Sequence, residues 1–275
     1  MAYGYKNGMM DFPFVKIYHY QLEKLKGASK IEIVFVGDSS LGNAIDIVEF
    51  KRLSGKNVQN LALTGSYGYA GSLNMIKRVV QVQKPEIVVI MHTPIILTLD
   101  VAYDGFLLTA LSMSEWKKNV PLLVLAKTFV NFDAFLSMVR TLIRKTGIPE
   151  NTHIANDYIR QGSLLNIRST ENYQVNIADI KIEKKIFLNK ITSFCNSNDL
   201  QCVYAIGPWF EDHCKQFSGF ISETNNIILS TGLALATEEP KCLAPHNLGD
   251  AWDHVAPHAK KEVTEFYYRK LRSFL

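Results

Sequence analysis

Short apolar runs rich in β-branched residues recur along this 275-residue chain, and stretches with helical periodicity separate them. The apolar runs predict buried strands, which we place at 31–36, 58–63, 87–91, 121–125 and 201–206. The periodic stretches predict helices, which we place at 41–53, 70–82, 133–144, 180–196 and 258–275. This alternation predicts an α/β protein with three layers, α/β/α, around a mostly parallel central sheet.

The middle of the chain departs from this alternation. Residues from about 100 to 175 include a polar stretch and a Trp-Lys-Lys run at 116–118. We expect a helical insertion there, lying over the sheet as a lid or a specificity element. No linker or internal repeat divides the chain, so we expect a single domain over residues 1–275.

Composition and charge argue against several classes of protein. Apolar residues make up 47% of the chain and charged residues 20%, which is typical of a globular protein and not of a disordered one. The net charge is only +4 and the basic residues are scattered, so we expect no nucleic-acid binding. The two most apolar stretches, 87–99 and 120–130, are too short or too interrupted to predict a membrane span.

Two features bear on the cellular compartment. The N-terminus lacks the basic and apolar regions of a signal peptide, so we expect a cytoplasmic protein, or an exported one if a leader was removed. The cysteines include no Cys-x-x-Cys pair, and their number and spacing fit unpaired thiols in a reducing compartment. One or two disulfides are the alternative. The four are Cys195, Cys202, Cys214 and Cys242.

The first candidate for chemistry is the turn Gly37-Asp38-Ser39-Ser40, which follows the first predicted strand. A serine between a strand and a helix lies where backbone N–H groups favour negative charge. Such donors can stabilise the oxyanion that forms when a hydroxyl attacks a carbonyl. The alternative is an ordinary turn in which Asp38 or Ser39 caps the helix.

Two further segments would complete such a site. Gly65 begins a glycine-rich loop after the second predicted strand, where it forms either an anion-binding nest or a plain tight turn. His254 lies near Asp250 and Asp253 just before the last predicted helix. A carboxylate beside a histidine fixes the tautomer that a base needs to activate a serine, although a structural histidine is the alternative. The carboxyl ends of parallel strands meet at one edge, where we expect the site.

Taken together, these segments resemble the SGNH (GDSL-like) hydrolase superfamily from about residue 31 to the end of the chain. Gly37-Asp38-Ser39 matches block I of that family, and the run from Asn60 to Gly65, Asn-Leu-Ala-Leu-Thr-Gly, matches block II. Asp250 to His254 approximately match the Asp-x-x-His of block V. The resemblance implies a flavodoxin-like SGNH fold, Ser39 as nucleophile, His254 as base and Gly65 as an oxyanion donor, with no cofactor and no metal ion.

The chain departs from the family pattern at two points. Block III normally supplies an asparagine as an oxyanion donor, whereas the third strand here runs into His92 and Thr93. Either of these residues would have to replace the asparagine, or the donor is weakened or absent. Asp250 lies four residues before His254, not three, and Asp253 is directly adjacent. We favour Asp250 as the acid that orients His254, with Asp253 as the alternative.

The resemblance implies a serine-dependent esterase or O-acyltransferase that works through a Ser-His-Asp triad and an acyl-enzyme. The altered block III resembles the transferase-like branches, many of which modify polysaccharides or glycans. We therefore expect a small-molecule or glycan ester as substrate and, for a transferase, an acyl donor. Aromatic residues near the predicted site would suit stacking on a sugar ring, although such residues are more often core: Tyr67, Tyr69, Trp209 and Trp252.

The rival hypothesis is a catalytically lapsed protein of the same fold that binds a glycan or a protein partner. A phosphoryl-transfer enzyme that uses the Gly65–Gly71 loop is a weaker idea, because this loop lacks the lysine and the paired carboxylates that such chemistry needs. The sequence does not indicate the oligomeric state.

Overall fold

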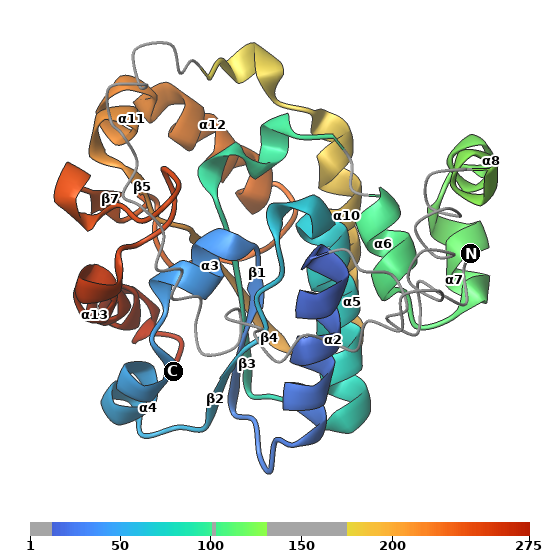
Figure 1. The fold of residues 1–275 in the computed structure, drawn as a ribbon, viewed down its shortest axis with the longest axis horizontal. Coiled ribbons are helices and arrows are strands. Elements are labelled where there is room, and N and C mark those ends of the chain that lie inside the picture. The colour runs from blue at the N-terminus through green and yellow to red at the C-terminus, as the bar shows by residue number, and fades with distance from the viewer. Residues whose placement is uncertain (1–12, 101–102, 131–174) are drawn as a thin grey trace, which may run out of the picture.

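The computed structural model describes residues 13–100, 103–130 and 175–275, with a five-stranded sheet at the centre (Figure 1). The strand order is β2-β1-β3-β4-β6, and every neighbouring pair is parallel. The predicted α/β/α architecture with a mostly parallel central sheet is therefore confirmed. The strands are β1 Ile33–Gly37, β2 Val58–Asn60, β3 Ile87–His92, β4 Gln201–Ile206 and β6 Ala234–Leu235.

The central strands are apolar because helices cover both of their faces. β1 and β3 are buried along their whole length, as expected for inner strands of a parallel sheet. Successive residues of a strand point to opposite faces, and the core divides in the same way. Val34 and Val88 belong to one apolar cluster, whereas Phe35 and Val89 belong to the other.

Two sets of helices enclose the sheet, as Figure 1 shows. One face is covered by α2 Pro13–Lys26, α5 Gly68–Val82, α10 Lys185–Ser197 and α12 Ser218–Leu229. The other face is covered by α3 Ser39–Ala44, α4 Ile47–Ser54 and α13 Lys260–Leu271. Further helices are α6 Tyr103–Thr109, α7 Met113–Asn119, α8 Leu122–Val130 and α11 Glu211–Gln216. Among the described helices, none has both the length and the apolar character of a membrane span.

The predicted strand at 121–125 is wrong, because these residues lie at the start of helix α8. Leu122 is 81% exposed and Leu123 is 75% exposed, so the run does not form the buried strand that its composition suggested. A short apolar run fits either a buried strand or a helix, and periodicity alone does not separate the two.

The predicted helices differ from the observed ones in detail. The stretch 41–53 contains two helices, because α3 ends at Ala44 and Asp46 caps α4 through the N–H groups of Val48 and Glu49. The stretches 70–82, 180–196 and 258–275 correspond to α5, α10 and α13. Residues 103–130 of the expected insertion are helical for the most part, whereas the predicted helix at 133–144 lies outside the described residues.

The expectation of unpaired thiols is also wrong. Cys195 of α10 is bonded to Cys202 of β4, and Cys214 of α11 is bonded to Cys242. The Cα atoms are 6.2 Å apart in each pair, within the range that a disulfide spans. Spacing along the chain concealed the pairing, because the fold sets which cysteines face each other.

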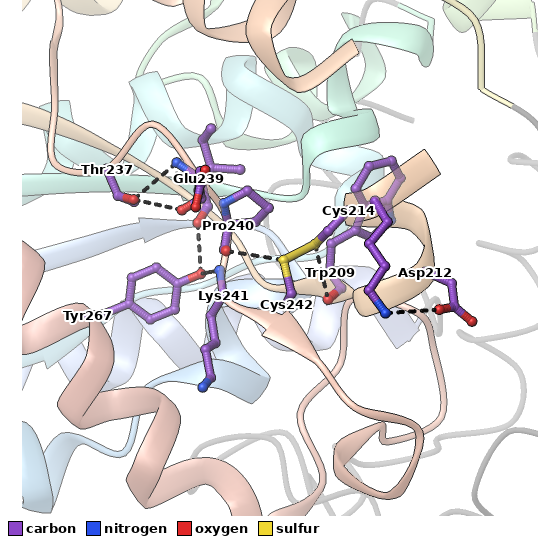
Figure 2. Close-up of a disulfide and its surroundings, with 11 residues drawn as sticks. Trp209, Asp212, Cys214, Thr237, Glu239, Pro240, Lys241, Cys242 and Tyr267 are labelled. Atoms are coloured by element: carbon purple, nitrogen blue, oxygen red, sulfur yellow. Dashed lines mark hydrogen bonds and ion pairs between the residues drawn. A yellow bond between two sulfur atoms is a disulfide. The ribbon is translucent and has the colours of Figure 1, made fainter. Parts of the chain in front are cut away.

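The second disulfide lies beside a small separate sheet. Its strands are β5 Trp209–Phe210 and β7 Cys242–Leu243, which pair in parallel. Figure 2 shows the disulfide between Cys214 and Cys242 at this sheet, next to Trp209. The segment after β7 leads to the loop that carries His254, so this sheet borders the candidate site.

Candidate active site

Strand β1 ends at the turn that carries Ser39. A Cβ atom on Gly37 would lie 1.7 Å from the carbonyl oxygen of Met91 in β3, so this position requires glycine. Asp38 follows and caps α3, with Oδ1 accepting hydrogen bonds from the backbone N–H (3.0 Å) and the hydroxyl (2.6 Å) of Ser40. Ser40 is fully buried and Ser39 is half-buried, so Ser39 is the more accessible serine of the turn.

Asp38 is a buried carboxylate held by several donors. Its Oδ2 accepts a hydrogen bond from the backbone N–H of Thr93 (3.0 Å) and lies 3.3 Å from Nδ1 of His92. Burial raises the pKa of Asp38, but the His92 ring and the hydrogen bonds from Ser40 and Thr93 outweigh it. The net pKa lies below the ordinary value of an aspartate, so Asp38 is ionised beneath the Ser39 turn.

His92 lies at the end of β3, between two polar partners. Its Nε2 is 2.8 Å from the hydroxyl of Ser72 in α5, and its Nδ1 faces Asp38. Ser72, His92 and Asp38 thus stand in the order of a Ser-His-Asp triad, yet they are only 1%, 0% and 1% exposed. A substrate cannot reach this serine, and both His92 nitrogens face protein groups, so the ring is not directed at an external oxyanion.

Thr93 comes directly after His92 and contacts two carboxylates. Its backbone N–H binds Asp38, and its hydroxyl lies near Asp253. This hydroxyl is buried and makes no well-aligned hydrogen bond among the described residues. Thr93 therefore connects the Ser39 turn to the loop that carries His254.

Gly65 lies beside the same edge of the sheet. The segment before it runs along β1, with the N–H of Leu61 bonded to the carbonyl of Phe35 (2.9 Å) and the N–H of Leu63 bonded to that of Gly37 (2.8 Å). Gly65 begins a short 3-10 turn, Gly65–Tyr67, and nothing lies within 4 Å of the place where its Cβ would be. A substrate atom therefore has room to approach the backbone at Gly65.

His254 lies in a loop closed by backbone hydrogen bonds. The N–H of Gly249 binds the carbonyl of His254 (2.7 Å), and Leu248 forms an antiparallel bridge with Val255. Within this loop, Nδ1 of His254 is 2.6 Å from Oδ1 of Asp250. Nε2 is on the side of Asp253, 3.8 Å from its Oδ1, which is too far for a hydrogen bond.

Three carboxylates set the charge around His254. Burial lowers the pKa of His254, but the hydrogen bond to Asp250 and the charges of Asp253, Asp250 and Asp38 outweigh it, so the net pKa lies above its ordinary value. Burial raises the pKa of Asp253, and the nearby charge of Asp38 adds to the rise. Asp250 thus has the contact that an orienting acid makes, whereas Asp253 lies at the opposite nitrogen.

Helix α13 brings the two ends of the chain together. The buried ammonium group of Lys260 donates to the carbonyl of Gly42 in α3 (3.1 Å), and Thr264 accepts from the N–H of Asp46 (2.8 Å). These contacts hold the loop before α13 close to the turn before α3. Within the described residues, no hydrogen bond joins the Ser39 hydroxyl to His254.

Most of the aromatic side chains near the site belong to the core. Tyr67, Tyr69 and Trp209 are at most 2% exposed, so they present no face to a sugar ring. Trp252 is only half-buried. Sequence reasoning missed the role of Ser72, because a serine inside a helical stretch carries no signal that a buried histidine will face it.

The comparisons with known proteins yield no relative. No family model matches the chain, and neither curated proteins nor solved structures provide a match.

Proposed function

We propose that this protein is a serine-dependent esterase or O-acyltransferase of SGNH type. The observation that carries the proposal is the 2.6 Å contact between Nδ1 of His254 and Asp250. An ionised carboxylate at Nδ1 keeps the proton there and leaves Nε2 as the basic nitrogen. Ser39 is the half-buried serine on the neighbouring turn, and its proton would pass to Nε2.

The proposed reaction has two steps. The Ser39 oxygen bonds to the ester carbonyl carbon while His254 takes the hydroxyl proton, and the alcohol then leaves with that proton. Water, or a second hydroxyl in a transferase, attacks the acyl-enzyme and restores Ser39. The N–H groups of Ser39 and Gly65 are the proposed oxyanion donors. Thr93 is the proposed third donor through its hydroxyl, which lies on the side of Asp253 and the His254 loop, whereas both nitrogens of His92 face Ser72 and Asp38.

The proposed substrate is an acylated carbohydrate or glycan, with a separate acyl donor if the protein is a transferase. This part rests on the resemblance to the transferase-like branches of the superfamily. The two disulfides support a place in an oxidising compartment, and hence export. Titration of free thiols in the unreduced, denatured protein should then find none.

A fluorophosphonate probe and p-nitrophenyl acetate test the catalytic proposal. The folded chain should react with the probe, and peptide mapping should place the adduct on Ser39. Ser39→Ala should lose both labelling and ester hydrolysis. Ser40→Ala is the matched control, because this neighbouring hydroxyl is fully buried and should not be the labelled group. Ester hydrolysis that persists in Ser39→Ala would exclude this nucleophile.

The second candidate function is that of a glycan- or partner-binding protein on the same fold. It is favoured by the placement of His92, whose ring is turned toward Asp38 and Ser72 and not toward the site. A folded chain that never reacts with the probe but binds acylated glycans in calorimetry would support this function over catalysis.

A further inference from the structure

The loop that carries His254 also carries a tryptophan that contacts the body of the protein. Trp252 is two residues before His254 and packs against both apolar clusters, one from each side of the sheet. It is half-buried, and its ring is directed at residues of β5 and α11. Trp252 therefore links the loop to elements that lie outside it.

Trp252 packs against two aromatic rings. Its ring centroid is 5.4 Å from that of Phe210, at an interplanar angle of 33°, and 5.3 Å from that of His213, at 61°. Phe210 and His213 also pack edge to face, 5.2 Å apart. Burial lowers the pKa of His213 to about 4, although Asp212 opposes this shift, so the ring at Trp252 is neutral near pH 7.

The elements that carry these rings are tied to one another. β5 pairs with β7, and the N–H of Trp209 binds the carbonyl of Lys241 (3.0 Å). The disulfide between Cys214 and Cys242 joins α11 to β7, as Figure 2 shows. We call β5, α11 and β7 the aromatic platform.

Within the loop, the backbone between Trp252 and His254 is tightly packed. A Cβ on Gly249 would lie 3.3 Å from Cβ of His254, so the two sides of the loop are in close contact. The N–H of His254 binds the carbonyl of Ala251 (3.1 Å), which closes a tight turn around Trp252. A shift of the tryptophan ring would therefore move His254.

We infer that Trp252 is a positioning residue, which fixes the His254–Asp250 pair relative to the Ser39 turn by docking on the aromatic platform. The expected effect on catalysis rests on the proposed function. The placement of His254 by Trp252 does not depend on it. A displacement of about 1 Å at a catalytic group can cost up to about 100-fold in rate.

The test uses the full, disulfide-bonded chain and three substitutions of Trp252. Trp252→Ala should lower kcat for p-nitrophenyl acetate about 10- to 100-fold with little change in KM. Trp252→Phe keeps an aromatic ring on the platform and should retain most of the activity. If Trp252→Ala does not fold, Trp252→Leu replaces it, because leucine keeps apolar volume without a ring.

The second readout is the titration of the His254 ring followed by NMR. The charged groups around this ring are Asp250 and Asp253 of the same loop and Asp38 of the turn before α3, and none is changed by these variants. In Trp252→Ala, the raised pKa of His254 should fall toward the ordinary value of about 6.5, because the loop then moves away from the charge of Asp38. Trp252→Phe should leave it in place.

Phe217→Leu is the matched control. Phe217 packs on Trp209 and His213, so its loss removes aromatic packing nearby while Trp252 keeps both of its partner rings, Phe210 and His213. The inference is overturned if Trp252→Ala leaves the titration of His254 unchanged, or if Phe217→Leu alters kcat and the titration as strongly. A wild-type chain with no esterase activity refutes the proposed function alone, because the NMR titration of His254 still tests the positioning role of Trp252.

Discussion

Two histidine–aspartate pairs lie near the Ser39 turn, and they differ mainly in exposure. His92 and Asp38 are at most 1% exposed, whereas the side chains of His254 and Asp250 are 13% and 19% exposed. In the buried pair, each ring nitrogen has a protein group beside it, including the serine hydroxyl of Ser72. In the accessible pair, Asp250 binds Nδ1 and Nε2 has no hydrogen bond among the described residues.

This difference separates a structural use of the same residue types from the chemical use that we propose for His254 and Asp250. The buried set of Ser72, His92 and Asp38 ties α5 and β3 to the turn before α3. A base must exchange protons with a substrate, and only the accessible pair has a nitrogen free to do so. Residue identity and order therefore do not identify a catalytic triad, and burial has to be considered as well.

The largest expected effect separates the two histidines by activity and by stability. His254→Ala should lower kcat/KM on the order of 10⁴-fold or more, because a triad histidine is needed for proton transfer. It should change the free energy of unfolding by only about 1 kcal/mol. His92→Ala should destabilise the fold by about 3–5 kcal/mol, because it leaves the buried charge of Asp38 without its partner.

Ester hydrolysis and urea unfolding of the same two variants measure these effects. A His92→Ala variant of unchanged stability that has lost activity would contradict the division between the pairs, because His92 would then act in the reaction.

The next effect concerns the two carboxylates of the loop. Asp250→Asn should lower kcat by up to about 10⁴-fold, since the amide no longer fixes the imidazole tautomer. Asp253→Asn should have a much smaller effect, because Asp253 makes no hydrogen bond to the ring. Steady-state kinetics on both variants decides the matter. If Asp253→Asn is the more damaging change, Asp253 is the orienting acid instead.

A change in pH should alter the stability contributions of the two pairs in opposite directions. The pKa of His254 is raised, so its contribution to stability is fully present below the ordinary value of about 6.5 and is lost as pH rises through the folded-state value. The pKa of Asp38 is lowered, so its contribution is present above about 3.9 and is lost as pH falls through the folded-state value.

Since the base must be neutral, kcat/KM should rise with pH through a midpoint above about 6.5. Rate profiles and thermal unfolding across this pH range provide the measurements. A rate midpoint well below 6.5 would mean that the carboxylates around His254 do not govern its protonation.

The smallest effect is expected at the serine of the buried set. Ser72→Ala removes a hydroxyl that contacts Nε2 of His92, and should cost about 1–3 kcal/mol of stability. Labelling by a fluorophosphonate and ester hydrolysis should stay at the wild-type level. Loss of labelling in a folded Ser72→Ala protein would show that the buried and accessible sets act together.

The sequence predicted four of the five strands of the sheet because their signal is local, whereas the two-residue strand β6 was not predicted. Runs such as Ile33–Gly37 and Ile87–His92 are buried on both faces, and their composition alone indicates this. The alternation of strands and helices then placed the ends of β1 and β3 at one edge. The run at 121–125 misled the prediction because composition cannot distinguish a short buried strand from an apolar helix with exposed leucines.

The candidate site was only partly predictable. Ser39, Asp250 and His254 lie in short segments with local signatures, and the sequence favoured Asp250 as the partner of His254 while leaving Asp253 as the alternative. The orientation of His92 depends on the register between β1 and β3 and on a serine of α5 twenty positions earlier. Such long-range placement leaves no trace in the local sequence pattern.

The disulfide beside β7 has a consequence for how the protein matures. Cys214 and Cys242 are 28 positions apart, and the intervening chain includes α12 and strand β6. In the native structure this bond joins α11 to β7, so it covalently closes the stretch of chain that contains α12 and β6. Protein produced in a reducing host would lack this covalent closure, and oxidative refolding would be the step that restores it.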